Sequence, residues 1–302
     1  MGSMKMTRRS LLAAAWGCAA GKSRAAAPLF SFGVVADVQY ADKPPAGKRE
    51  YSRSLRKLEA CCAAFGRERL RFVIQLGDLV DGGLENLVRV LAVFNRLKTR
   101  RYHVVGNHDA DIPRDSLLAR LGLRRAWYDF SIARWRFVVL DGTDAGVFPG
   151  WDSHSSHAEE GRRMLGELRR RKEPHAQDWN GGLGADQMAW LRQVLARAHS
   201  RGQRAILFCH QPVLPESCRP DHLLWNYREV LDCIDRSPAV VAYFNGHDHR
   251  GGYAQRGGVH FLTVPGLVEN DPEDCAMIAD VYPDAIRLRG FTGAGARHLL
   301  FP

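Results

Sequence analysis

Short apolar runs alternate with longer amphipathic stretches through most of the chain. The runs are rich in β-branched and aromatic residues, which is typical of buried strands, whereas the stretches between them repeat their apolar residues at helical spacing. The expected strands are residues 32–36, 72–76, 102–105, 137–140, 205–209 and 240–245, and the expected helices are residues 50–65, 84–98, 185–200 and 222–234. This alternation predicts an α/β protein with crossover helices.

The pattern changes after Gly251, where three short expected strands, residues 259–264, 276–281 and 285–288, are separated by turn residues. We expect this region to form a terminal β-hairpin that completes a second sheet. Residues 142–184 are polar and rich in Gly, His and Arg, and they are predicted to form one long loop. A loop of that length in a compact domain usually has a function.

The N-terminus carries a twin-arginine pattern, in which Arg8 and Arg9 precede an Ala-rich apolar run. This pattern predicts an export signal over residues 1–27, cleaved after Ala27, with residues 1–3 as a cloning remnant. The mature protein is then a single catalytic domain, residues 28–302, in the periplasm or outside the cell. Two alternatives stay open: a basic terminus without an export role, and a lipoprotein anchored through Cys18.

No later stretch reaches the ~18 apolar residues of a membrane-spanning helix, so we expect no stable membrane association after signal removal. Half of the formal net charge of +10 lies in the signal segment, as Lys5, Arg8, Arg9, Lys22 and Arg24. The remainder is only mildly basic and lacks a nucleic-acid-reading motif, which argues against a nucleic-acid partner. Six cysteines remain in the mature chain, an even number that permits disulfides without establishing them.

Five of the apolar runs end in side chains that can bind a metal ion. They are Asp37 with Gln39, Asp78, Asn107 with His108, His210, and His247 with His249. Each one alone could be a helix cap or a buried polar residue. Residues just beyond the carboxyl ends of strands line the binding crevice of an α/β sheet, so these groups are expected to converge. Imidazole, carboxylate and amide donors without a thiolate suit Mn, Fe, Co or Zn.

In their order and their glycine-punctuated turns, these motifs resemble those of the calcineurin-like metallophosphoesterases. The resemblance implies a four-layer α/β/β/α sandwich that holds two divalent metal ions. It assigns Asp37, Gln39, Asp78 and His249 to one ion, and Asp78, Asn107, His210 and His247 to the other. Asp78 would bridge the two ions, and the catalytic His108 would contact the reacting phosphate without binding metal.

The expected chemistry explains these residue types. Two divalent ions contribute four positive charges and Asp37 and Asp78 return only two negative ones, so the site attracts phosphate. Ions roughly 3.5–4 Å apart can activate one water and clamp the oxygens of an in-line displacement. His108 is expected to stabilise the charged transition state or to protonate the leaving oxygen.

A closer resemblance is to the manganese-dependent ADP-ribose/CDP-alcohol diphosphatase group. It rests on Gln39, where most cyclic-nucleotide phosphodiesterases of this superfamily have His, and on segments such as residues 180–183, 226–231 and 246–253. One departure is Asp109, where the group commonly has Glu. The resemblance implies cleavage of a small nucleotide-linked pyrophosphate with Mn²⁺ favoured. The alternatives are a cyclic-nucleotide or general phosphodiesterase and an inactive ligand-binding module, which the intact ligand set disfavours.

The candidate substrate-binding residues are drawn mainly from the same segments. They are Arg49, Asn180, Gly181, Gly182, Leu183, Asn226 and Tyr253. Arg49 is expected to pair with a second phosphate, with a solvated surface role as the alternative.

Overall fold

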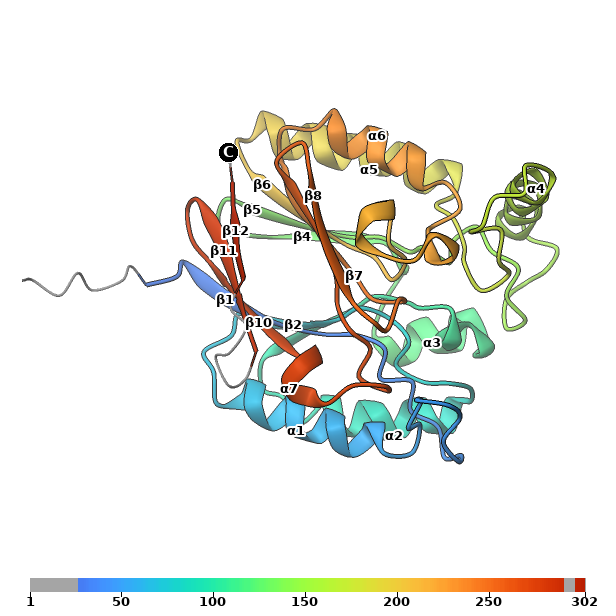
Figure 1. Ribbon diagram of the computed structural model, residues 1–302, viewed down its shortest axis with the longest axis horizontal. Helices are drawn as coiled ribbons and strands as arrows, with labels where there is room; N and C mark the ends of the chain where they lie inside the picture. Colours follow the sequence, from blue (N-terminus) through green and yellow to red (C-terminus); the bar gives the residue numbers. More distant parts are fainter. Residues whose placement is uncertain (1–26, 291–296, 302) are drawn as a thin grey trace, which may run out of the picture.

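Two six-stranded sheets stack face to face at the centre of the protein (Figure 1). The computed structural model describes residues 27–290 and 297–301, so the predicted signal at residues 1–27 lies outside the described part except for its last residue. The first sheet has the order β12-β11-β10-β1-β2-β3 and the second the order β4-β5-β6-β7-β9-β8.

In the first sheet, β1 (Phe30–Val35), β2 (Phe72–Gln75) and β3 (Arg100–His103) are parallel. The strands β10 (Met277–Val281), β11 (Ala285–Arg289) and β12 (Arg297–Leu300) extend this sheet in antiparallel fashion from β1. The prediction that the last hairpin completes the second sheet is therefore wrong for β10 and β11. Period-two alternation marks a strand but does not identify the sheet that it joins.

In the second sheet, β5 (Trp135–Val139), β6 (Arg204–Phe208), β7 (Val240–Asn245) and β9 (Val259–Thr263) are parallel. The edge strands β4 (Tyr128–Ile132) and β8 (Gly252–Arg256) are antiparallel to their neighbours.

Helices cover the outer faces of both sheets (Figure 1). The first sheet packs on α1 (Ser54–Gly66), α2 (Leu84–Phe94), α3 (Arg114–Leu121) and the short α7 (Pro272–Cys275) through one apolar cluster. The second sheet packs on α5 (Ala185–Ser200) and α6 (Tyr227–Asp235) through another cluster.

A third cluster fills the space between the sheets. It is built largely of aromatic rings, with Phe32 stacked on Phe72 at a centroid distance of 4.8 Å and in edge contact with Phe137, Phe208 and Phe244. Three apolar layers between four layers of secondary structure confirm the predicted α/β/β/α sandwich.

Residues 142–184 do not form one long loop as predicted, because they contain α4 (Ser156–Arg170). The Ser155 side chain caps this helix by accepting a hydrogen bond from the Ala158 backbone N–H at 3.2 Å. The buried stripe is narrow, mainly Leu165 and Leu168, and charged residues surround it, which hides the helical period in the sequence. Figure 1 shows α4 to one side of the sandwich.

Two predicted helices begin later than expected, and one ends earlier. The helix α1 starts at Ser54, and α2 ends at Phe94. The helix α6 starts at Tyr227, because Pro220–His222 forms a separate 3-10 turn, η3. The six cysteines of the described part are free thiols. Within residues 27–290 and 297–301, no helix is long and apolar enough to cross a membrane.

Candidate metal centre

The predicted metal ligands follow the carboxyl ends of parallel strands in both sheets. Asp37 follows β1, Asp78 follows β2 and Asn107 follows β3, whereas His210 follows β6 and His247 follows β7. Since the two sheets are stacked, these turns meet at one edge of the sandwich. This is the part of an α/β fold where ligands bind.

The backbone is strained at these positions. Six non-glycine residues in the described part of the chain have a positive φ, and four of them are predicted ligands: Asp37 (52°), Gln39 (41°), Asp78 (55°) and His247 (70°). A non-glycine residue in this region costs free energy and persists only where the surrounding contacts hold it. Such strain gathers at functional sites.

Glycines allow the ligand turns to approach one another closely. A Cβ atom on Gly106 would lie 2.1 Å from Asp78 Oδ1, and one on Gly246 would lie 2.4 Å from Asp37 Oδ2. Neither position accepts a side chain without displacing a carboxylate. The glycines in the sequence motifs are therefore required by the packing of the site.

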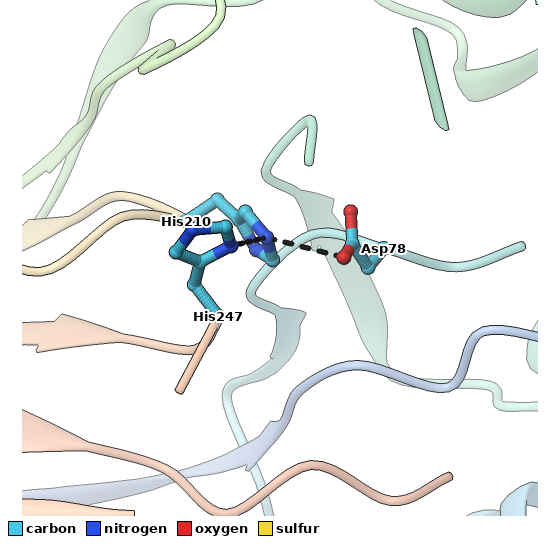
Figure 2. A group of neighbouring side chains, drawn as sticks. All are labelled: Asp78, His210 and His247. Atoms are coloured by element: carbon cyan, nitrogen blue, oxygen red, sulfur yellow. Dashed lines mark hydrogen bonds and ion pairs between the residues drawn. The ribbon is translucent and has the colours of Figure 1, made fainter. Parts of the chain in front are cut away.

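One half of the cluster gathers around His210. Its Nε2 lies 3.2 Å from Asp78 Oδ2, 3.1 Å from Asn107 Oδ1 and 3.1 Å from His247 Nδ1. Figure 2 shows Asp78, His210 and His247 pointing toward one another from separate segments. One ligand atom from each of these three buried residues lies within 4.8 Å of the others, a spacing that can hold a metal ion.

The other half of the cluster gathers around His249. Its Nε2 lies 3.4 Å from Asp37 Oδ1 and 3.1 Å from the Gln39 amide, which also contacts Asp78 Oδ2 at 2.9 Å. The Oε1 atom of Gln39 is buried and has no hydrogen-bond partner. An amide oxygen left without a donor among carboxylates and imidazoles fits a bound cation. Asp78 contacts both halves.

Each of the three ligand histidines uses its second ring nitrogen elsewhere. His210 Nδ1 lies 2.8 Å from the Leu76 carbonyl, His249 Nδ1 lies 2.8 Å from Glu269 Oε1, and His247 Nε2 lies 2.7 Å from Asn180 Oδ1. Such acceptors fix the ring tautomer and leave the other nitrogen as a ligand. Glu269 carries no motif signal, and this role for it follows only from the structure.

The local charges favour a cation in both halves. Burial lowers the pKa of His210, but the Asp78 and Asp37 carboxylates outweigh burial and raise it to about 9. Burial likewise lowers the pKa of His249, and Asp37 and Glu269 outweigh it and raise that pKa to about 9. Metal ions and protons therefore compete for these imidazoles, and metal binding releases protons.

His108 lies beside the cluster and not within it. Its Nδ1 contacts Asp81 Oδ1 at 2.6 Å, and its Nε2 lies 4.0 Å from Asp78 Oδ2. Burial lowers the pKa of His108, but the carboxylates of Asp78 and Asp81 outweigh burial and raise it. Asp81 also pairs with Lys43. A partly exposed imidazole with a raised pKa, next to the ligands, is suited to donate a proton or a hydrogen bond to a substrate oxygen.

Asp109 holds the turn that carries Asp78. Its carboxylate accepts hydrogen bonds from the backbone N–H groups of Gly106, Asp78, Leu79 and Val80 at 2.8–3.2 Å. Four donors on one carboxylate explain why an acidic residue follows His108. Its place directly after His108 in the motif is the only sequence signal for this role.

The candidate substrate-binding residues are not gathered in one place. Arg49 lies beside Glu269, with Nε to Oε1 at 3.5 Å, and it interacts electrostatically with Asp78 and His108, so it faces the metal centre. Tyr253 lies on β8, where its hydroxyl contacts His260 and its ring lies under Arg297. That position belongs to a separate hollow of about 430 Å³ next to Arg250.

The remaining candidates are buried: residues 180–183 form one segment, and Asn226 at the start of α6 is hydrogen-bonded to it. Leu183 packs in the apolar cluster under α5 and α6, and its backbone exchanges two hydrogen bonds with the Asn226 amide, at 3.0 and 2.9 Å. Gly182 pairs with the Ala145 backbone, and a Cβ on Gly181 would lie 2.3 Å from the Gly142 carbonyl. The Asn180 side chain contacts the His175 and Asp221 carbonyls and His247 Nε2.

Taken together, two carboxylates, three imidazoles and two amides surround the site, with no thiolate among them. This donor set and the orphaned Gln39 oxygen fit divalent ions such as Mn²⁺. Residues 30–251 match the model of the calcineurin-like phosphoesterases, and the chain belongs to this family.

Within the family, the chain is similar to proteins named manganese-dependent ADP-ribose/CDP-alcohol diphosphatase. It is 35% identical to the one from Oryza sativa subsp. japonica, over 87% of this chain and 91% of the relative. The relative from Homo sapiens is 30% identical, over 87% of this chain and 90% of the relative. The crystal structure of a dimetal phosphatase from Danio rerio superposes with a TM-score of 0.83 at 29% identity, covering 91% and 100% of the two chains.

Proposed function

We propose that the protein hydrolyses nucleotide-linked pyrophosphates such as ADP-ribose and CDP-alcohols, with two Mn²⁺ ions, as one catalytic domain over residues 28–302. The observation that carries this proposal is the cluster of the seven predicted ligand side chains, in which Asp78 Oδ2 contacts both His210 and the Gln39 amide. The names of the relatives support the substrate class.

In this proposal, Asp37, Gln39, Asp78 and His249 hold one ion, and Asp78, Asn107, His210 and His247 hold the other. When bound, the two ions supply an activated water and neutralise phosphate charge. The protein groups then act on the substrate directly. His108, oriented by Asp81 through its Nδ1, presents Nε2 to the reacting phosphate and stabilises or protonates the leaving oxygen.

Arg49 is assigned to the second phosphate of the substrate. It lies beside Glu269 at the metal centre, and about a third of its side chain is exposed. A guanidinium next to a phosphate forms charge-assisted hydrogen bonds. A cyclic nucleotide has no second phosphate, so it cannot use this contact.

With Mn²⁺, ADP-ribose or a CDP-alcohol should be cleaved between its phosphates to give a nucleoside monophosphate, with a higher kcat/KM than cyclic AMP. Arg49→Ala should lower kcat/KM for the pyrophosphate by roughly 10–100-fold, which is the effect of losing one hydrogen bond to a charged group. The kcat/KM for cyclic AMP should stay unchanged. Steady-state kinetics with product identification measures both effects.

The matched control is Arg53→Ala, because the Arg53 side chain is 71% exposed and pairs with Glu50. This variant should hydrolyse both substrates at the rate of the unaltered enzyme. A higher kcat/KM for a cyclic nucleotide than for every pyrophosphate tested would instead identify the protein as a cyclic-nucleotide phosphodiesterase. The metal centre itself would be unaffected by that outcome.

We propose also that the protein is exported through the twin-arginine pathway to the periplasm or beyond. The support is the sequence pattern of Arg8 and Arg9 before an apolar run and Ala27. Replacing both arginines with lysine should keep the precursor in the cytoplasm, whereas Arg24→Lys, outside the pair, should be exported normally. Cell fractionation with N-terminal sequencing decides this: a mature terminus at Pro28 in the periplasm of the double variant contradicts the proposal.

A further inference from the structure

The orientation of the Asn180 amide is determined by its neighbours. The side chain is fully buried, and its Nδ2 donates to the carbonyl oxygens of His175, at 3.1 Å, and Asp221, at 2.8 Å. Carbonyl oxygens only accept hydrogen bonds, so the nitrogen of the amide must face them. The amide oxygen therefore faces His247 Nε2, at 2.7 Å.

This orientation dictates the tautomer of His247. An amide oxygen only accepts, so Nε2 of His247 must carry the hydrogen. The lone pair of the neutral ring is then on Nδ1, which lies 3.1 Å from His210 Nε2 and faces the Asp78 half of the cluster. The other tautomer would place a hydrogen, and no lone pair, toward this position.

We propose that Asn180 is a positioning residue for the metal centre: it locks His247 in the tautomer whose Nδ1 binds the ion shared with Asp78, Asn107 and His210. This role rests on the proposed two-metal centre. It makes Asn180 a hydrogen-bond partner of His247 instead of a substrate-binding residue. His210 and His249 have their own acceptors, Leu76 and Glu269, so the lock acts on His247 alone.

The segment around Asn180 is built to hold it rigidly. The Asn180 backbone N–H donates to the Gln177 carbonyl at 3.1 Å, and the same carbonyl accepts from the Trp225 indole N–H at 3.1 Å. The next residue, Gly181, accepts from the Trp225 backbone N–H at 2.7 Å. A Cβ at Gly181 would strike the Gly142 carbonyl, so this close packing requires glycine.

The test is a Mn²⁺ titration of the metal-free mature chain without substrate, followed by calorimetry and by electron paramagnetic resonance. The unaltered protein should bind two ions that give a spin-coupled signal. Asn180→Ala should retain one ion and weaken the other by roughly 10–100-fold, the usual effect of removing a partner of a metal-binding histidine. The spin-coupled resonance signal should then be replaced by the signal of isolated Mn²⁺ ions.

Two variants separate this role from general packing. Asn180→Asp keeps an acceptor for Nε2–H but loses the donor to the His175 and Asp221 carbonyls, so it should recover only part of the lost affinity. Trp225→Phe loosens the same segment by one hydrogen bond but leaves the acceptor, and it should bind both ions normally. The proposal is overturned if Asn180→Ala binds two ions with unchanged affinity, or if Trp225→Phe is weakened as much as Asn180→Ala.

A measurement on the unaltered protein avoids any folding defect of the variants. Nitrogen-15 NMR of the His247 ring in the metal-free protein should show a protonated Nε2 and an unprotonated Nδ1. The opposite tautomer would overturn the proposal. Neither experiment contains a substrate, so a failure of the diphosphatase assignment would leave both results unchanged, and a failure here would leave that assignment standing.

Discussion

Replacing Asp78 with alanine is expected to destroy the paired metal centre and to lower the rate of hydrolysis by more than about 10³-fold. Asp78 Oδ2 contacts both His210 and Gln39, the two halves of the cluster. Without its carboxylate the two halves share no ligand and the site loses one of its two carboxylate ligands, so the loss of rate should exceed the ~10²–10³-fold cost of losing a single transition-state donor. Metal analysis and steady-state kinetics measure the effect.

Asp78→Asn is the matched variant, since asparagine keeps the size and tolerates the positive φ of this position. It should lose the paired centre while the fold stays intact. Asp42→Ala removes an exposed carboxylate that pairs only with Arg89 on the surface, and it should retain both ions. Two ions bound to Asp78→Ala with unchanged affinity would exclude the bridging role.

His108→Ala is expected to keep both metal ions and to lower kcat by ~10²–10³-fold, about 2.7–4 kcal/mol of transition-state stabilisation. The His108 ring is held by Asp81 at 2.6 Å and lies beside the ligand cluster, so its loss removes a donor to substrate without removing a ligand. Metal analysis on the same sample separates the two effects. Because this donor acts on charge that develops in the transition state, KM should change less than kcat.

An exposed histidine on α5, His199, provides the control, because this helix lies on the outer face of the second sheet. His199→Ala should have the kcat of the unaltered enzyme. If the kcat of His108→Ala equals that of the unaltered enzyme, His108 has no part in the mechanism. If it loses metal, His108 is part of the ligand shell, and the separation between ligands and catalytic residue is incorrect.

The core strands and the convergence of the ligands could be predicted because both depend on local patterns. Runs such as β1 and β7 are mostly apolar and buried throughout, and a polar side chain just after each of them must lie at the carboxyl end of the sheet. Because β1 and β7 belong to the two stacked sheets, Asp37 and His247 meet although 210 residues separate them. The alternation of strands and helices predicts an α/β protein, whereas the four-layer arrangement is implied by the resemblance to the metallophosphoesterases.

The roles of Asn180 and Glu269 could not be predicted, because they depend on contacts between segments far apart in the sequence. Asn180 reaches His247 across 67 residues, and Glu269 reaches His249 from a loop with no motif of its own. Likewise, α4 is missed because its buried stripe is narrow and its charged residues dominate the pattern. The sheet that β10 joins is set by long-range pairing with β1.

The most direct test of the two-metal centre is a crystal structure of the mature protein with Mn²⁺, using anomalous scattering to locate the ions. Two peaks are expected roughly 3.5–4 Å apart, as in other two-metal hydrolases. Asp78 should lie between them, with Asp37, Gln39 and His249 around one ion and Asn107, His210 and His247 around the other. A single peak, or two peaks that do not share Asp78, would contradict the binuclear centre.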